Sequence, residues 1–161
     1  MEEFQRLAKE AEQSLVVADH MLTVTYPLVK DTKLLLNILM NIQQGMVKAM
    51  GAILSNERLF KRIPPYGPSF YDQMEVFQAR ATRRYSLNPE YLKTMKDIHE
   101  VLELHKSSPV EFQRQDKLVI CSDKYRLSTI SVAQLRGNLD LAKLFIADMQ
   151  RMVSKHERIF R

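Results

Sequence analysis

The chain has 161 residues, of which 45% are apolar and 27% charged, and its formal net charge is +5. These values are typical of one soluble globular domain, spanning residues 1–161, and its few glycines and prolines disfavour a loop-rich all-β fold. One cysteine excludes an internal disulfide, and the longest nearly uncharged run, residues 14–29, is too short to span a bilayer. No secretory leader is recognisable, so we expect a cytoplasmic protein without membrane contact.

A first helix is predicted from about residue 3 to about residue 26, because apolar residues recur there at steps of three and four. From Ser14 onward this segment is apolar on almost every side, which predicts that its second half lies in the middle of a bundle. Pro27 lacks an amide hydrogen and restricts Tyr26, so we expect a kink or a short break at this point.

A second helix is predicted from residue 31 or 32 to about residue 62, where the proline-rich loop IPPYGP begins. Gly45 and Gly51 lie inside this helix and suggest that a neighbouring helix approaches closely. A third, shorter helix is predicted to start after Ser69 and to run to about residue 85, because apolar side chains again recur there with helical spacing.

A fourth helix is predicted to start at SLNPEY, where Asn88 can cap it and Pro89 suits its first position, and to stop at KSSP. The runs KLVIC and RLSTIS then predict a β-hairpin over about residues 117–131, with SDKY as its loop. The last helix runs from about residue 131 nearly to the end. The sequence therefore predicts a mainly α, single-domain bundle of about five helices, with one β-hairpin between the fourth and the fifth.

The stretch QARATRRY contains three arginines, Arg80, Arg83 and Arg84, and no acidic residue. Such a cluster attracts phosphates or an acidic protein surface, although many basic clusters are only the solvated face of a helix. Phe77 and Tyr85 flank the cluster and could stack on nucleic-acid bases, but the helical spacing favours a core position for Phe77. The leading hypothesis is a non-catalytic binding module for RNA, DNA or an acidic protein.

The hairpin DKLVICSDKYR and its approach form a second candidate binding site. Arg114 and Arg126 could together bind a phosphate or carboxylate, with Asp116 and Asp123 orienting them and Tyr125 beside them in the loop. The alternative is that these charges pair with one another and keep the exposed strand edge from aggregating. Cys121 follows three apolar residues in a strand, which favours a buried thiol over a nucleophile.

The last helix contains RMVSKH, in which Arg151 is followed by His156. This spacing resembles the arginine-x4–6-histidine motif of HEPN domains, helical bundles that include metal-independent ribonucleases and nucleotide-binding proteins. The resemblance implies an RNase or nucleotide-binding alternative with Arg151 and His156 as catalytic residues. Met152 stands where those proteins usually carry a polar residue.

Three longer segments, HMLTVTYPLVKDTKLLL, KSSPVEFQRQDKLVICSDKYR and the terminal helix, are together similar to an archaeal family of helical proteins of unknown function. This resemblance covers most of the chain. It implies a helical bundle and a cytoplasmic setting, and it provides neither an activity nor site residues.

The remaining polar residues suggest a third hypothesis, a small-ligand-binding bundle with a pocket near His20, Tyr26 and His105. The alternative for His105 is a core hydrogen bond, since it lies on the apolar stripe of its helix. His99 and Glu103 share a helix face but lack the further ligands that a metal site needs, so no metal and no cofactor is expected. A methionine-rich bundle with spare apolar surface could also form a homodimer.

Overall fold

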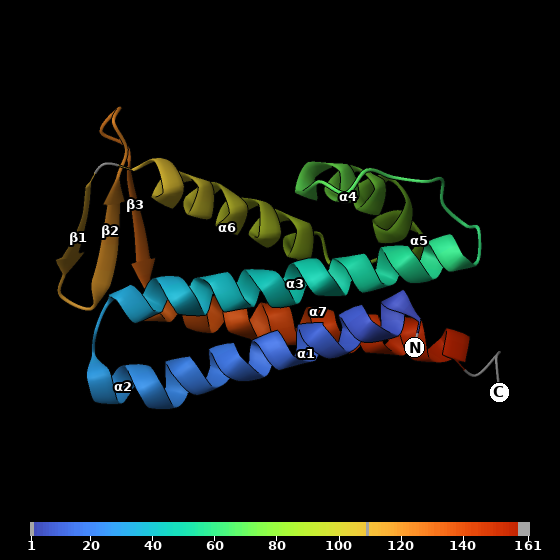
Figure 1. Cartoon of the computed structure of the whole chain (residues 1–161), viewed down its shortest axis with the longest axis horizontal. Helices are drawn as coiled ribbons and strands as arrows, with labels where there is room; N and C mark the ends of the chain where they lie inside the picture. The colour runs from blue at the N-terminus through green and yellow to red at the C-terminus, as the bar shows by residue number, and fades with distance from the viewer. Residues whose placement is uncertain (1, 109, 158–161) are drawn as a thin grey trace.

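The computed structural model describes residues 2–108 and 110–157, with side chains as far as Ser154, and helices dominate it (Figure 1). The helical segments are α1 (Glu3–His20), η1 (Met21–Thr25), α2 (Tyr26–Val29), α3 (Lys33–Leu59), α4 (Phe70–Val76), η2 (Phe77–Thr82), α5 (Arg83–Tyr85), α6 (Pro89–Ser107) and α7 (Val132–Glu157). Because α1–η1–α2 and α4–η2–α5 are each continuous, the described residues form five helical rods, as predicted.

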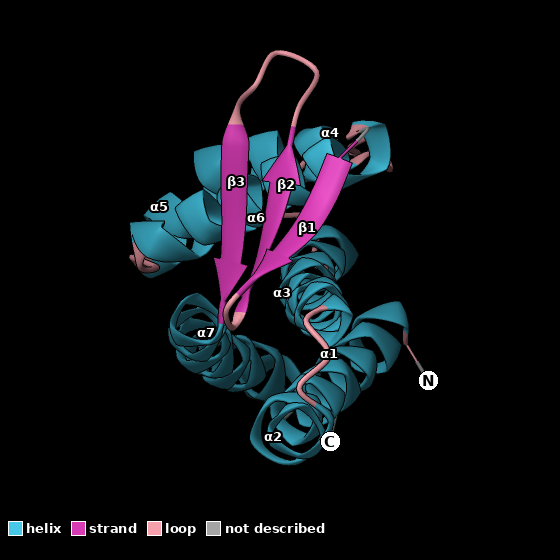
Figure 2. Ribbon diagram, turned by 90° about the vertical axis from the view of Figure 1, so that its left-hand side faces the viewer, coloured by secondary structure: helices cyan, strands magenta, loops and turns pink. Residues whose placement is uncertain are grey.

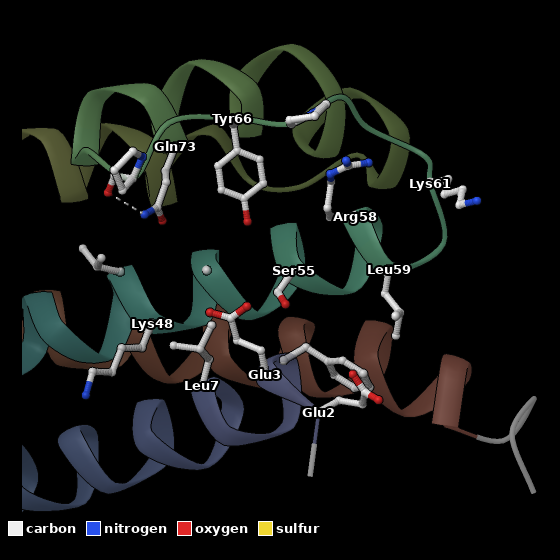
Figure 3. A pocket seen from close by; sticks show the side chains of 15 residues that line it. Glu2, Glu3, Leu7, Lys48, Ser55, Arg58, Leu59, Lys61, Tyr66 and Gln73 are labelled. Carbon is white, nitrogen blue, oxygen red and sulfur yellow. Dashed lines mark hydrogen bonds between the residues drawn. The ribbon is translucent and has the colours of Figure 1, made fainter.

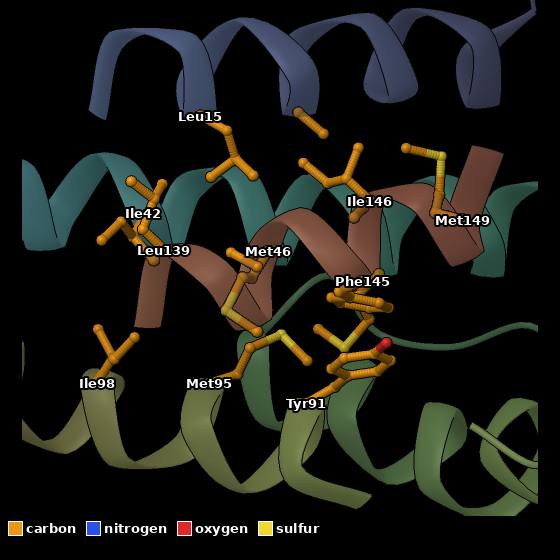
Figure 4. Packing of buried hydrophobic residues seen from close by; sticks show 14 of the residues in the cluster. Leu15, Ile42, Met46, Tyr91, Met95, Ile98, Leu139, Phe145, Ile146 and Met149 are labelled. Atoms are coloured by element: carbon orange, nitrogen blue, oxygen red, sulfur yellow. The ribbon is translucent and has the colours of Figure 1, made fainter. Parts of the chain in front are cut away.

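The core lies between two layers. The long helices α1, α3 and α7 pack together, and α6 with α4–α5 covers the side of α3 and α7 that faces away from α1 (Figure 2). Side chains from α1, α3, α6 and α7 interdigitate there, among them Met46, Met95 and Phe145 (Figure 4). The rings of Tyr91 and Phe145 stack with their centroids 4.7 Å apart. Unbranched methionines fill the gaps that such aromatic pairs leave.

The first helix is not broken at Pro27, contrary to the expectation of a short break there. A π-helical turn, η1, ends at Thr25, two residues before the proline, and there the Tyr26 amide donates to the Met21 carbonyl oxygen five residues earlier. The rod then continues to Val29 and ends at Lys30, whose φ of 53° places it in the left-handed region. The result is one helical rod over residues 3–29.

The prediction that the second half of this rod lies in the middle of the bundle is wrong. One side, including Leu22 and Tyr26, is buried, but the opposite side faces solvent. Val16 and Leu28 on that side are 68% and 81% exposed. The apolar residues were too evenly spread around this helix for the sequence pattern to indicate which side is buried.

The sheet has three antiparallel strands instead of the two of the predicted hairpin. These are β1 (Val110–Arg114), β2 (Lys117–Cys121) and β3 (Leu127–Ser131), in the order β1-β2-β3. The second and third strands lie where the sequence predicted them, and the loop between them covers residues 122–126. The first strand, VEFQR, alternates apolar and polar residues, but only Val110 and Phe112 are apolar, and all five residues are exposed, so this short pattern did not stand out as a strand.

Gly45 allows α1 and α3 to approach closely. The stability of variants with a side chain at this position tests the close contact. A Cβ atom at Gly45 would lie 2.7 Å from Leu15 Cδ2 and 3.3 Å from the Ala11 carbonyl oxygen, whereas a Cβ at Gly137 in α7 would meet nothing within 4 Å. We expect Gly45→Ala to lower the free energy of unfolding by about 1–3 kcal/mol. Gly137→Ala should raise it by up to about 1 kcal/mol, because alanine favours a helix.

Urea denaturation of the two variants beside the parent protein measures both effects. An unchanged or raised stability of Gly45→Ala would show that the two helices separate without cost, and would contradict the close packing at this glycine. The Gly137→Ala variant is the matched control for the intrinsic effect of replacing glycine in a helix.

Candidate anion-binding site

A buried carboxylate, that of Glu57, organises a group of arginines near the end of α3. Glu57 is only 1% exposed, and the Tyr85 hydroxyl donates a hydrogen bond to its Oε1. Arg62 Nη1 lies 3.5 Å from Oε1, and Arg84 Nη1 lies 3.7 Å from Oε2. Because these three groups come from two separate segments, Glu57 ties α5 and the chain after α3 to the helix.

The way α3 ends places Arg62 beside Glu57. Lys61 follows the last helical turn with a φ of 56°, in the left-handed region, and the chain reverses there. The amide of Arg62 then donates to the Glu57 carbonyl oxygen at 3.0 Å, which closes the helix end. The Arg62 guanidinium also lies over the Phe60 ring, 5.2 Å from its centroid, and this contact holds its plane in place.

The segment η2–α5 supplies the other three arginines on one face. Arg80 and Arg84 are four residues apart, as are Ala79 and Arg83, so all four stack along the same side of the helical turns. Together with Glu57, Arg62 and Ile63 they line a pocket of about 360 Å³. The structure thus brings Arg80, Arg83 and Arg84 to the lining of one pocket.

The pocket carries an excess of positive charge. Four guanidinium groups line it, with Glu57 as the single carboxylate in its lining. Within the part of the chain that the structure describes, neither Arg80 nor Arg83 forms an ion pair, and both are exposed. Guanidinium groups bind phosphates and carboxylates through two parallel hydrogen bonds, so Arg80 and Arg83 are free to bind an anion.

The Tyr85 hydroxyl is held by the buried carboxylate of Glu57. Burial, together with its hydrogen bond to Glu57, raises the pKa of Tyr85, so the hydroxyl keeps its proton and remains a donor at neutral pH. The Arg84 guanidinium lies 5.8 Å from the centroid of the Tyr85 ring. Phe77 is buried against Phe145 and cannot stack on a base, in agreement with the core position that its spacing favoured.

The hairpin residues do not form a common site. Arg114 pairs in register with Lys117 at one end of the sheet, while Arg126 lies in the loop at the other end, so the two cannot bind one phosphate. Asp116 is 3.5 Å from the Tyr26 hydroxyl, which ties its turn to α2. The other two predicted loop residues, Asp123 and Tyr125, are exposed.

The alternative, that these charges pair with one another, is not seen either: among the described residues no ion pair joins the predicted hairpin arginines and aspartates. The polar contact that the first strand does make is between Glu111 and the His105 ring. His105 is therefore bound to the edge strand and is not a core histidine. Cys121 is half-buried at the end of β2. Figure 1 shows that the sheet and α5 lie at opposite ends of the bundle, so the two predicted arginine groups are separate surfaces.

The three residues of the predicted ligand pocket do not share one of the described pockets: His20 is exposed and Tyr26 is buried, whereas His105 lines a pocket of about 320 Å³ between α3 and α6. A cleft of about 830 Å³ lies elsewhere, between the start of α1, the second half of α3 and the proline-rich loop. In Figure 3 the Tyr66 hydroxyl points into this cleft, with Arg58 beside it. Burial and the nearby Glu3 raise the pKa of Tyr66. The residues that line this cleft come from three segments that are distant in the sequence, so no local motif predicted it.

The ribonuclease alternative gains no support from Arg151. This residue is exposed on α7 and pairs with Asp148, whose Oδ2 accepts a hydrogen bond of 2.6 Å from the Tyr91 hydroxyl. The side chain of His156 lies outside the described residues.

Sequence reasoning missed Glu57 and Arg62. Glu57 follows Ile53 by four residues, on the buried stripe of α3, and an acidic residue at such a position is a signal that a cationic partner must meet it. The partners themselves lie in separate segments, so the sequence could not identify them.

Comparison of the chain with family models, curated proteins and solved structures finds no match. None of the helices in residues 2–108 and 110–157 has the length and apolar content needed to cross a membrane.

Proposed function

We propose that the protein is a non-catalytic binding module for single-stranded nucleic acid, whose backbone phosphates bind in the pocket formed by Arg62, Arg80, Arg83 and Arg84. The observation that carries this proposal is that Arg80 and Arg83 form no ion pair with any described residue, beside two arginines that a buried carboxylate already holds. The site has cations in excess and a concave shape.

The four arginines differ in their partners, and this difference supports a role in binding rather than only in solubility. Glu57 orients Arg62 and Arg84 before any ligand arrives, so less side-chain entropy is lost on binding. Arg80 and Arg83 contribute the charge that remains uncompensated. Phosphates of a nucleic-acid strand present anionic oxygens at regular intervals, which favours a nucleic acid over an acidic protein whose carboxylates are irregularly spaced.

The test is a fluorescence-anisotropy titration of labelled single-stranded RNA and DNA across a salt series, with EDTA present. Two uncompensated arginines should neutralise about two phosphates, so log K should fall with log salt with a slope of about −1.4 for a single strand. The oligonucleotide should remain intact. An acidic peptide that binds more tightly than both nucleic acids would redirect the proposal to a protein partner, and salt-independent binding would contradict it.

A further inference from the structure

The cleft of about 830 Å³ between α1, α3 and the proline-rich loop is separate from the arginine pocket, and the two share no lining residue. Its volume lies in the range of sites that hold small organic ligands. Gly51 forms part of its floor. A Cβ atom at Gly51 would lie 3.4 Å from Leu7 Cδ1 and 3.8 Å from Gln73 Oε1, so the absent side chain leaves the space between α1, α3 and α4 open.

Hydrogen-bond acceptors lie at the end of the cleft near Gly51. Gln73 Nε2 donates to the Pro68 carbonyl oxygen at 3.1 Å, which fixes the orientation of the amide and leaves Oε1 on the side of Gly51. The Glu3 carboxylate points into the cleft from α1 (Figure 3). Because Glu3 is exposed and its ion pair with Arg6 is long, at 3.8 Å, its carboxylate is available to an ammonium group.

Hydrogen-bond donors lie toward the opposite end of the cleft. Ser55 and Arg58 follow Gly51 by four and seven residues, so they lie about 6 Å and about 10 Å farther along the axis of α3. The Arg58 guanidinium makes one long hydrogen bond, of 3.5 Å, to the Ile63 carbonyl oxygen. Arg58 and Lys61, which both line the cleft, are exposed, and neither forms an ion pair with a described residue. This end is therefore suited to a carboxylate.

Two hydroxyl groups lie between these ends. In Figure 3 Tyr66 lies between Gln73 and Arg58, and its hydroxyl points into the cleft. Burial and the nearby Glu3 raise the pKa of Tyr66, whereas Arg58 lowers it, so both charges act on this hydroxyl. The hydroxyls of Tyr66 and Ser55 form no hydrogen bond with a described residue, and each can donate to one peptide group and accept from another. Apolar side chains complete the lining, among them Phe4, Leu7 and Val47.

The other two charged residues of the lining already have partners within the chain. Lys48 forms an ion pair of 3.1 Å with Glu10. Glu2 and Gln5 form the capping box at the start of α1. The charges that remain for a ligand are therefore a carboxylate toward one end of the cleft and two cations toward the other.

We propose that this cleft binds a short peptide of about three residues, with its free amino group at Glu3 and its free carboxyl group at Arg58. Three extended residues span at most about 10 Å, which matches the separation of Gly51 and Arg58 along α3. A free amino acid carries both charged groups on one carbon atom and cannot reach both ends. The apolar lining favours apolar side chains in the peptide. This class of ligand is distinct from the nucleic acid proposed for the arginine pocket.

Isothermal titration calorimetry with trileucine tests this proposal. Trileucine should bind, whereas its N-acetylated and its C-amidated forms should each bind about 10-fold more weakly, because each lacks one charged hydrogen-bonding group. Free leucine should bind more weakly than either of these forms. A failure of trileucine to bind would overturn the proposal. Equal affinity for the doubly blocked peptide, or for free leucine, would overturn it as well.

Two variants locate the ends of the bound peptide. Glu3→Gln should weaken the binding of trileucine about 10-fold without changing that of the N-acetylated form, and Arg58→Gln should do the same without changing that of the C-amidated form. Glu12→Gln, at an exposed position of α1 outside the lining, is the matched control. A variant that weakens all forms of the peptide equally would overturn the assigned ends. Arg80→Glu with Arg83→Glu should retain peptide binding, so the cleft and the arginine pocket can fail separately.

Discussion

Reversing the charges of Arg80 and Arg83 to glutamate is expected to lower the affinity for single-stranded RNA by about 100-fold or more at about 50 mM salt. The two arginines are exposed and form no ion pair in the described part of the chain, so their loss removes attraction without leaving a buried group unpaired. The new carboxylates would also repel the phosphates. Anisotropy titrations with the same oligonucleotide measure the change.

The matched control is Arg114→Glu with Arg126→Glu, which changes the net charge by the same amount at the opposite end of the molecule. This control should lose much less affinity, because only the long-range field is weakened. Equal losses in the two double variants would show that binding follows total charge and would contradict a localised pocket. Arg80→Lys with Arg83→Lys keeps both positive charges but removes the bidentate hydrogen bonding of guanidinium, so this variant separates the two contributions to affinity.

Removing Arg62 and Arg84 together is expected to destabilise the fold by about 3 kcal/mol, because Glu57 would remain buried without a cation. Arg62→Met with Arg84→Met keeps most of the side-chain volume and removes both guanidinium groups. Arg84 is half exposed, so the loss of Arg84 should contribute less to this destabilisation than the loss of Arg62. Urea denaturation of the double variant measures the loss.

The decisive comparison adds Glu57→Gln to that double variant. The neutral amide removes the uncompensated charge, so the triple variant should regain most of the lost stability. Glu57→Gln alone should have a smaller effect, because the two arginines can turn toward water. A triple variant no more stable than the double variant would show that the arginines act through packing, and not through the charge of Glu57.

Much of the helical architecture was readable from local chemistry. Asn88 and Ser69 accept hydrogen bonds from the amides of Glu90 and Asp72, so both helices start where a capping residue predicts. The proline-rich loop ends α3 close to the predicted point. These features depend on residues a few positions apart, and the sequence contains them in full.

The buried side of α1, the strand β1 and the arginine pocket were decided by the tertiary structure. The valines of α1 are compatible with burial on either side, and only packing against α3 and α7 leaves Val16 and Val24 outside. Strand β1 forms because β2 offers a partner edge, not because its own pattern is apolar. Arg62 and Arg84 meet because both reach one buried carboxylate.

The sequence by itself thus determined a helical bundle with its helix ends, a small sheet before the last helix, and a local excess of arginines. The tertiary structure alone decided which arginines share a site. It joined Arg80 and Arg83 to Glu57 and Arg62, and it placed Arg114 and Arg126 at opposite ends of a sheet. The physical reason is that helix ends and turns follow from neighbouring residues, whereas a site follows from how distant segments pack.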